Sequence, residues 1–176
     1  MLTPKENLLE SLKKDGHPLC LNNCYTMMRG FAPDPVFKLV RGNRVRGTNS
    51  VDVWGTQILF PADAPAAVPY VTEANQVVQD ICNWKDYVKV PDLLGRCQEG
   101  WEAAIESGKA IDHDKYLTMV VMGTGIFEQL HMLMTFEDTL TNMLEEPEAM
   151  EELIDAICEY RLNYMKLIVE HLHPDV

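Results

Sequence analysis

The side chains best suited to bind a ligand lie in three short stretches of the sequence. Arg29 carries a guanidinium that pairs with carboxylate or phosphate groups, although a surface arginine on a loop is an equal alternative. Asp52 and Trp54 set a carboxylate near a large flat ring, which suits a planar ligand, although a Trp beside a strand is more often part of the core. Gly123 and Gly125 let the chain turn tightly and let a ligand approach the backbone, without forming the dinucleotide fingerprint.

Other residue types with chemical potential do not form a recognisable site. Glu128 stands at the start of a predicted helix, where the helix dipole favours a carboxylate whether or not it is catalytic. The sequence has no Ser-His-Asp arrangement, no P-loop and no His-Glu-x-x-His motif. Five dispersed cysteines, with Cys20 and Cys24 as the one close pair, favour reduced thiols over a metal site. His171 and His173 are interpreted as an exposed helix terminus, so the catalytic residues are unassigned and no metal site is expected in this chain.

Charge and hydropathy argue against two classes of protein. The 176 residues include 15 Lys and Arg against 27 Asp and Glu, a net charge of −12, which argues against a nucleic-acid binder. Apolar runs fall far short of the roughly 18 residues that cross a bilayer, and no secretory signal begins the chain, so a cytoplasmic protein is expected. Arg41, Arg44 and Arg46 form a basic stretch, interpreted as an exposed loop with anion binding as the alternative.

The elements that would position these residues alternate between helices and strands. The Thr3 N-cap, Pro4 and Glu6 begin a helix predicted to reach Lys14, and the chain is predicted to be irregular over 27–51. Strands are predicted at 18–21 and 116–122, with β-type sequence resuming at 51–55 and small strands at 58–60, 70–71 and 76–78. Further helices are predicted over 80–87, 91–107, 126–134, 136–144 and 147–171, and residues 174–176 are expected to begin another strand.

This alternation predicts an α/β fold with parallel strands joined by helical crossovers. Residues 1–176 would form one incomplete domain, since so few strands leave sheet edges and helix faces uncovered. We expect part of the apolar stripe of the longest helix to lack a partner and its amides to exchange fast, as in one half of a larger fold. The stripe consists of Met150, Leu153, Ile154, Ile157, Tyr160, Tyr164, Leu167 and Ile168.

Four segments carry a resemblance to a known family. They are LTPKENLLESL at 2–12, DVWG at 52–55, WKDY at 84–87 with VPDL at 90–93, and GTGIFE at 123–128 followed by EPE at 146–148. In this order and spacing they resemble the uroporphyrinogen decarboxylase superfamily. The similarity is closer to its corrinoid-dependent methyltransferase-like branch than to the true decarboxylases.

The resemblance implies the N-terminal half of a (β/α)₈ TIM barrel, because members are barrels of about twice this length. Sites in such barrels lie at the carboxyl ends of the strands, which selects 22–29, 52–57 and 123–128, with Gln57, Phe127 and Glu128 among the substrate-binding candidates. A corrinoid on a partner protein is implied, and the Asp52 carboxylate and Trp54 ring would suit a corrin or tetrapyrrole face. Zinc, which activates a thiol in this branch, would be bound by residues beyond Val176.

Two alternatives to methyl transfer remain. The first is decarboxylation of a tetrapyrrole, although Arg29 stands without the second arginine of the true decarboxylases, and Gln57 replaces their aspartate. The second is a non-catalytic half-barrel that pairs with itself or with a separate C-terminal half. The expected partners are therefore a corrinoid protein, a tetrapyrrole-like small molecule, or a missing half.

Overall fold

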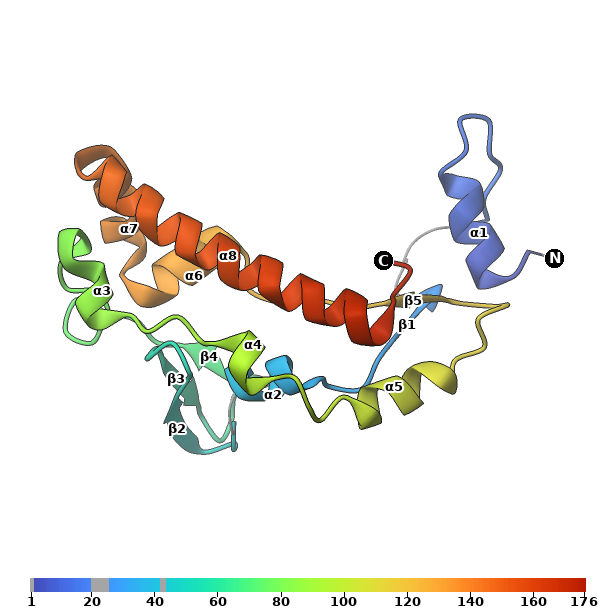
Figure 1. Ribbon diagram of the computed structural model, residues 1–176, viewed down its shortest axis with the longest axis horizontal. Coiled ribbons are helices and arrows are strands. Elements are labelled where there is room, and N and C mark those ends of the chain that lie inside the picture. The colour runs from blue at the N-terminus through green and yellow to red at the C-terminus, as the bar shows by residue number, and fades with distance from the viewer. Residues whose placement is uncertain (1, 20–25, 42–43) are drawn as a thin grey trace. The chain divides into compact units, whose positions relative to one another are not determined.

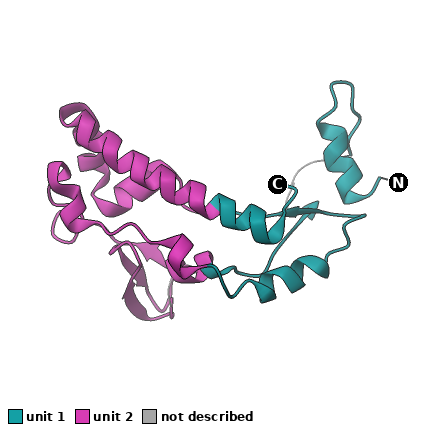
Figure 2. Ribbon diagram, viewed as in Figure 1, with its two compact units in different colours: residues 1–35, 98–122, 165–176 teal, residues 36–97, 123–164 magenta. Residues whose placement is uncertain are grey.

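The structure is a computed structural model of a mixed α/β protein, and it describes residues 2–19, 26–41 and 44–176 (Figure 1). The chain divides into two compact units, each built from segments that are distant in sequence (Figure 2). Unit 1 comprises residues 1–35, 98–122 and 165–176, and unit 2 comprises residues 36–97 and 123–164. The single barrel domain expected over 1–176 stays a prediction.

The elements divide between the units as follows. Unit 1 contains α1 (Pro4–Ser11), β1 (Met28–Gly30), α5 (Glu102–Lys109) and β5 (Leu117–Met119). Unit 2 contains α2 (Pro35–Arg41) from its second residue, β2 (Thr48–Val51), β3 (Gln57–Phe60), β4 (Val68–Pro69), the 3₁₀ turn η2 (Ile81–Asn83), α3 (Trp84–Tyr87), α4 (Leu93–Arg96), α6 (Ile126–Leu133) and α7 (Phe136–Glu145). The long helix α8 (Pro147–Leu172) gives residues to both units.

Unit 1 is organised by parallel strand pairing. β1 pairs with β5 in parallel, with Met28 opposite Leu117. The Val176 amide donates to the Thr118 carbonyl (3.1 Å), and the Val120 amide donates to the Val176 carbonyl (3.0 Å). This is the pattern of a parallel ladder, so β5 pairs with both β1 and Val176. Residues 174–176 were expected to begin another strand, and the backbone hydrogen bonds of Val176 to β5 agree with that expectation.

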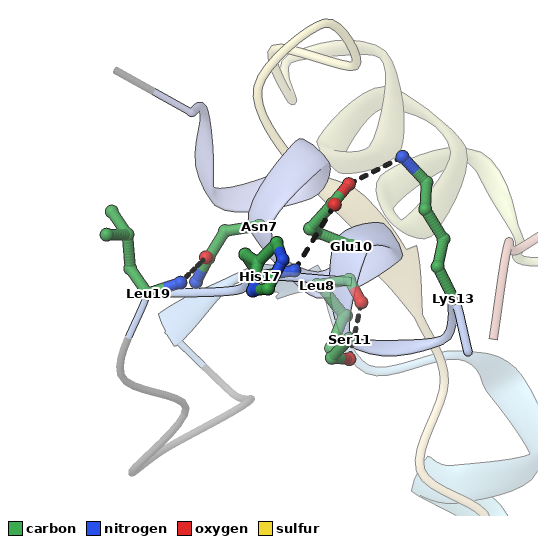
Figure 3. A network of polar contacts seen from close by, with 7 residues as sticks. All are labelled: Asn7, Leu8, Glu10, Ser11, Lys13, His17 and Leu19. Atoms are coloured by element: carbon green, nitrogen blue, oxygen red, sulfur yellow. Dashed lines mark hydrogen bonds and ion pairs between the residues drawn. The ribbon is translucent and has the colours of Figure 1, made fainter. Parts of the chain in front are cut away.

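The start of the chain differs from the prediction. The capping box of Thr3 is confirmed, but α1 ends at Ser11 rather than near Lys14. Side chains of α1 then hold the segment that follows: the Glu10 carboxylate accepts a hydrogen bond from the His17 amide (3.3 Å), and the Asn7 side-chain Oδ1 accepts one from the Leu19 amide (2.5 Å) (Figure 3).

A strand predicted at 18–21 is therefore not found at Pro18 and Leu19, because a side chain takes the amide that a sheet would need. The rest of that strand, residues 20 and 21, lies outside the described residues. The first parallel strand is β1, within the stretch that was expected to be irregular and that also holds α2 and β2.

Unit 2 contains a separate antiparallel sheet in the order β2-β3-β4. The small strand expected at 58–60 is confirmed within β3. The strands expected at 70–71 and 76–78 are wrong: β4 lies at Val68–Pro69 instead. The amides of Val77 and Val78 both donate to the Leu133 carbonyl (2.8 and 2.9 Å) at the end of α6, so they are not available to a sheet.

The helices of the second half of the chain were predicted well. Those expected at 126–134, 136–144 and 147–171 are confirmed as α6, α7 and α8, and the stretch 80–87 holds η2 and α3. The helix expected over 91–107 is interrupted between α4 and α5, where Gly100 has a φ of +88° that a helix does not allow. Across the described ranges, no helix is long and apolar enough to cross a membrane.

The expectation of an uncovered stripe on α8 is wrong for the residues named. All eight are buried except Ile154, which is half-buried. The large apolar side chains that α8 leaves exposed are on different positions: Leu162 (56%), Met165 (50%) and Val169 (53%).

Candidate functional site

The strongest candidate site is a cavity of about 170 Å³ within unit 2. It is bounded by α2, by the residues at 123 and 124, and by the part of α8 near Tyr160. Arg41, Arg44 and Arg161 line it, and we call it the three-arginine cleft. Among the described lining residues none carries a carboxylate: the rest are Val36, Phe37, Val40, Gly123, Thr124, Tyr160 and Tyr164.

Helical spacing explains why these side chains share one cleft. Val36 and Val40 are four residues apart on α2, so they lie on one face, and Val36 is fully buried. Arg41 occupies the last turn of α2, where a cation interacts favourably with the helix dipole. Tyr160 and Tyr164 repeat the same spacing on α8, and both are buried.

The loop that follows β5 along the chain is held by Arg161. One nitrogen of its guanidinium, Nη1, donates to the carbonyls of both Gly123 (3.4 Å) and Thr124. Thr124 has a φ of +60°, an uncommon conformation for a residue with a side chain. The guanidinium therefore stabilises a strained loop as well as lining the cleft. A Cβ added at Gly123 would meet no atom within 4 Å, which leaves open space at this wall.

Arg44 interacts electrostatically with Arg41 and with Asp52. Its Nε donates to the carbonyl of Arg41 (3.1 Å). Burial, and then the nearby Arg41 charge, lower the pKa of Arg44, whereas the Asp52 charge raises it. Burial raises the pKa of Asp52 above the ordinary carboxyl value, against the opposing effects of amide hydrogen bonds and of Arg44. Asp52 is thus an electrostatic neighbour of the cleft without lining it.

Trp54 packs against Tyr160, one of the residues that line the cleft. Its ring is only 2% exposed and packs edge-to-face on Tyr160, with centroids 4.9 Å apart at 79°. The turn that carries it is fixed by Asp52, whose Oδ1 accepts the amides of Trp54 and Thr56 (both 2.9 Å). The core interpretation of Trp54 therefore holds, and its connection to the cleft is indirect, through Tyr160.

The grouping of 22–29, 52–57 and 123–128 at the ends of parallel strands is partly wrong. Residues 22–25, like Cys20 and Cys24, lie outside the described residues. Residues 52–56 form the turn between antiparallel β2 and β3, and Gln57 begins β3, so this stretch does not follow a parallel strand. Gly123 does follow β5, as expected.

Arg29 and Gln57 have other partners. Arg29 lies in β1 of unit 1, where it donates to the carbonyls of Thr26 (3.1 Å) and Met28 (2.9 Å) and covers the Tyr116 ring at 3.7 Å. Gln57 is exposed, and its side-chain Oε1 accepts a hydrogen bond from the Asn75 side-chain amide (3.1 Å).

The remaining candidates lie at the start of α6. Gly125 is the N-cap of α6, and a Cβ there would meet the Glu128 carboxylate, which folds back over the helix start. Phe127 packs against His131 and Phe136, with centroids 5.6 Å apart in both cases. None of Gly125, Phe127 and Glu128 lines the three-arginine cleft.

Sequence reasoning missed Arg161 and its two tyrosine neighbours as site residues. The basic stretch at 41–46 did indicate an anion site, because anion binding was its alternative interpretation. Two of its three arginines, Arg41 and Arg44, line the cleft. The sequence indicated Arg161 more weakly, as a charged residue inside the apolar pattern of α8, between Tyr160 and Tyr164.

The metal implied by the family resemblance does not fit the described residues. Within 2–19, 26–41 and 44–176, no group of three or more His, Cys, Asp or Glu side chains is arranged to hold a metal ion. Comparison with known proteins adds no relative: no family model, curated protein or solved structure matches the chain.

Proposed function

We propose that this chain is the N-terminal half of a barrel of the uroporphyrinogen decarboxylase type, and that the completed barrel moves a methyl group to or from a corrinoid on a partner protein. The observation that carries the proposal is the parallel pairing of β5 with both β1 and Val176. Successive parallel strands separated by helices are the repeating unit of such barrels. Two strands and one paired residue cannot close a barrel, so the activity requires further strands.

Two observations favour methyl transfer over decarboxylation. Arg29 is engaged with backbone carbonyls and an aromatic ring, so the arginine expected to hold substrate carboxylates is committed elsewhere. Gln57, at the position of the decarboxylases' aspartate, is exposed and its side chain accepts a hydrogen bond from Asn75, while the Asp52 carboxylate accepts the amides of its own turn. Tetrapyrrole decarboxylation is therefore the weaker alternative.

The proposal also includes a cytoplasmic location. Cys82 and Cys158 are not joined in disulfide bonds, and cysteines outside disulfides are typical of a reducing compartment. Zinc would supply thiol activation in the family's reaction. Because the described residues do not fit a zinc site, no step through zinc is assigned to them.

The test uses a polypeptide that continues this chain through the strands that complete the barrel. It is incubated with methylcobalamin and the thiol 2-mercaptoethanesulfonate, and the loss of methylcobalamin is followed by absorbance. In the expected reaction the thiolate forms a sulfur–carbon bond, the methyl–cobalt bond breaks, and its electron pair stays on cobalt. A protein without zinc that is inert toward methylcobalamin would contradict the proposal, and CO₂ release from uroporphyrinogen would favour the decarboxylase alternative.

A second candidate is a half-barrel that acts as a pairing module. It is favoured by the exposed apolar side chains of Leu162, Met165 and Val169, which recur at helical spacing on α8. Sedimentation of the purified 176-residue chain tests it, since a dimer is expected. A monomer at all concentrations would exclude self-pairing.

A further inference from the structure

We propose that the three-arginine cleft is a binding site for a small oxyanion, a carboxylate or a phosphate monoester, carried on an apolar or aromatic body. This inference goes beyond methyl transfer, which assigns no role to Arg41, Arg44 or Arg161. It also holds whichever reaction the completed barrel performs, because it depends only on residues of unit 2.

The first argument is charge. Three arginines line one cavity of about 170 Å³ in a protein whose net charge is −12, and none of its described lining residues is acidic. The Arg41 charge opposes that of Arg44, and Arg44 is partly removed from water, so a bound anion would relieve both costs. Asp52 offsets part of this charge from outside the cleft, and it is held in place by its own turn.

The second argument is positioning. Arg161 is fixed by the carbonyls of Gly123 and Thr124, and Arg44 is fixed by the carbonyl of Arg41. Arg41 itself lies 5.3 Å from the Phe37 ring centroid. Guanidinium groups that are already oriented lose less freedom on binding, and their planar donors match carboxylate and phosphate oxygens.

The third argument is the apolar part of the wall. Val36, Val40 and Phe37 from α2 face the same cavity as the rings of Tyr160 and Tyr164. A cavity that combines apolar side chains with a few charged groups is typical of a site for a small organic ligand. A bare inorganic ion would leave this surface unused.

The fourth argument is the position in the sequence of two segments that line the cleft. α2 follows the carboxyl end of parallel strand β1, and the residues at 123 and 124 follow the carboxyl end of parallel strand β5. In α/β folds, the segments that follow parallel strands at this end are the ones that carry ligand-binding residues.

The experiment titrates the full 176-residue chain by calorimetry, with no corrinoid or methyl donor present, so its result is independent of the methyl-transfer test. The probes are benzoate, phenyl phosphate, benzyl alcohol and inorganic phosphate. We expect saturable binding of benzoate or phenyl phosphate, with benzyl alcohol and inorganic phosphate each weaker by about tenfold or more. The tighter of the two aromatic anions identifies carboxylate or phosphate as the preferred group.

Matched variants locate the site. Arg41→Gln and Arg44→Gln should each weaken the preferred anion by about tenfold. Arg46→Gln is the control from the same basic stretch, since Arg46 lies over the Phe60 ring and donates to Ala62 outside the cleft, and it should change affinity by less than about twofold. Gly123→Leu should abolish binding by filling the cleft, because residue 123 has open space and no positive φ.

Three results would overturn the inference. They are no saturable binding of either aromatic anion, equal binding of benzyl alcohol, or an Arg46→Gln loss as large as that of Arg41→Gln. Arg41 is exposed, so its variant keeps the test decisive even if Arg44→Gln disturbs the fold.

Discussion

Asp52 in unit 2 and Asp175 in unit 1 accept similar hydrogen bonds, and yet their pKa values are displaced from the ordinary carboxyl value in opposite directions. Asp52 accepts two backbone amides, and Asp175 accepts the Thr118 amide (2.8 Å) and the Thr118 hydroxyl (2.9 Å). The pKa of Asp175 is lowered, first by the Thr118 amide, whereas burial raises the pKa of Asp52. Asp175 is exposed and Asp52 is half-buried, so desolvation outweighs hydrogen bonding only at Asp52.

The opposite pKa changes correspond to two different roles of a carboxylate in this protein. Asp175 joins the end of the chain to β5, because the Asp175 amide also donates to the Thr118 hydroxyl (3.0 Å). Asp52 shapes a turn whose Trp54 packs behind the three-arginine cleft, and its charge acts on Arg44. The first carboxylate stabilises a sheet, and the second adjusts the electrostatics beside a candidate site.

The largest effect is expected from Trp54→Ala, which removes the packing beside the Asp52 turn. Deleting a large buried ring that contacts Tyr160 should lower the free energy of unfolding by about 3 to 5 kcal/mol. Leu144→Ala is the matched control on an exposed apolar residue, with an expected change within about 0.5 kcal/mol. Urea denaturation measures both, and a similar loss in the two variants would contradict the stabilising packing of the buried Trp54 ring against Tyr160.

In unit 1, Thr118→Val removes the hydroxyl that exchanges hydrogen bonds with Asp175 while keeping the side-chain shape. We expect a loss of about 1 to 2 kcal/mol and faster hydrogen exchange at the amides of Val120 and Val176. Thr141→Val, at an exposed position of α7, provides the control. Unchanged exchange at Val176 would show that the backbone ladder alone holds this segment.

The sequence predicted helices better than strands for a local reason. Thr135 caps α7, and Pro147 begins α8, so both helices carry their start signals within a few residues. The break before α5 was missed because the apolar period continues through it, whereas α4 ends at Arg96 and Gly100 adopts a positive φ before α5 begins. The first strand was misplaced because the Asn7 side chain competes for the amide of Leu19.

The candidate site was predicted only in its local parts. Gly123 was selected because two glycines follow a strong strand, and Asp52 with Trp54 because their types stood out. The partner that completes the cleft, Arg161, meets Gly123 only through tertiary contact with a distant part of the chain. A single sequence holds no signal for that contact, so the three arginines could not be grouped in advance.

A third prediction concerns pH and Asp175. Because its folded-state pKa is lowered, ionised Asp175 stabilises the fold fully above about pH 4, the unfolded value, and this contribution is lost as the pH falls through the lower folded-state pKa. Asp175→Asn should therefore cost up to about 1 kcal/mol at neutral pH and nothing in strong acid. Unfolding free energies across this range test the sign, and a cost independent of pH would contradict the role of the charge.

The smallest effect, and the sharpest test of the comparison, is expected at Asp52. Its raised pKa means that the folded state holds the proton more tightly than the unfolded state, so this contribution to stability is present below about pH 4 and is lost as the pH rises through the folded-state value. Asp52→Asn keeps an oxygen for the amides of Trp54 and Thr56 but removes the buried charge.

Relative to the unsubstituted protein, the Asp52→Asn variant should gain stability between acid and neutral pH, by no more than about 0.5 kcal/mol because the attraction to Arg44 is lost as well. Asp63→Asn, on an exposed loop, controls for the general effect of removing one negative charge.

Removing the Asp52 charge also leaves Arg44 without its neighbouring carboxylate, so benzoate or phenyl phosphate should bind about two- to threefold more tightly at low salt. A variant that loses stability toward neutral pH, in the manner of Asp175→Asn, would mean that hydrogen bonding rather than burial governs both carboxylates.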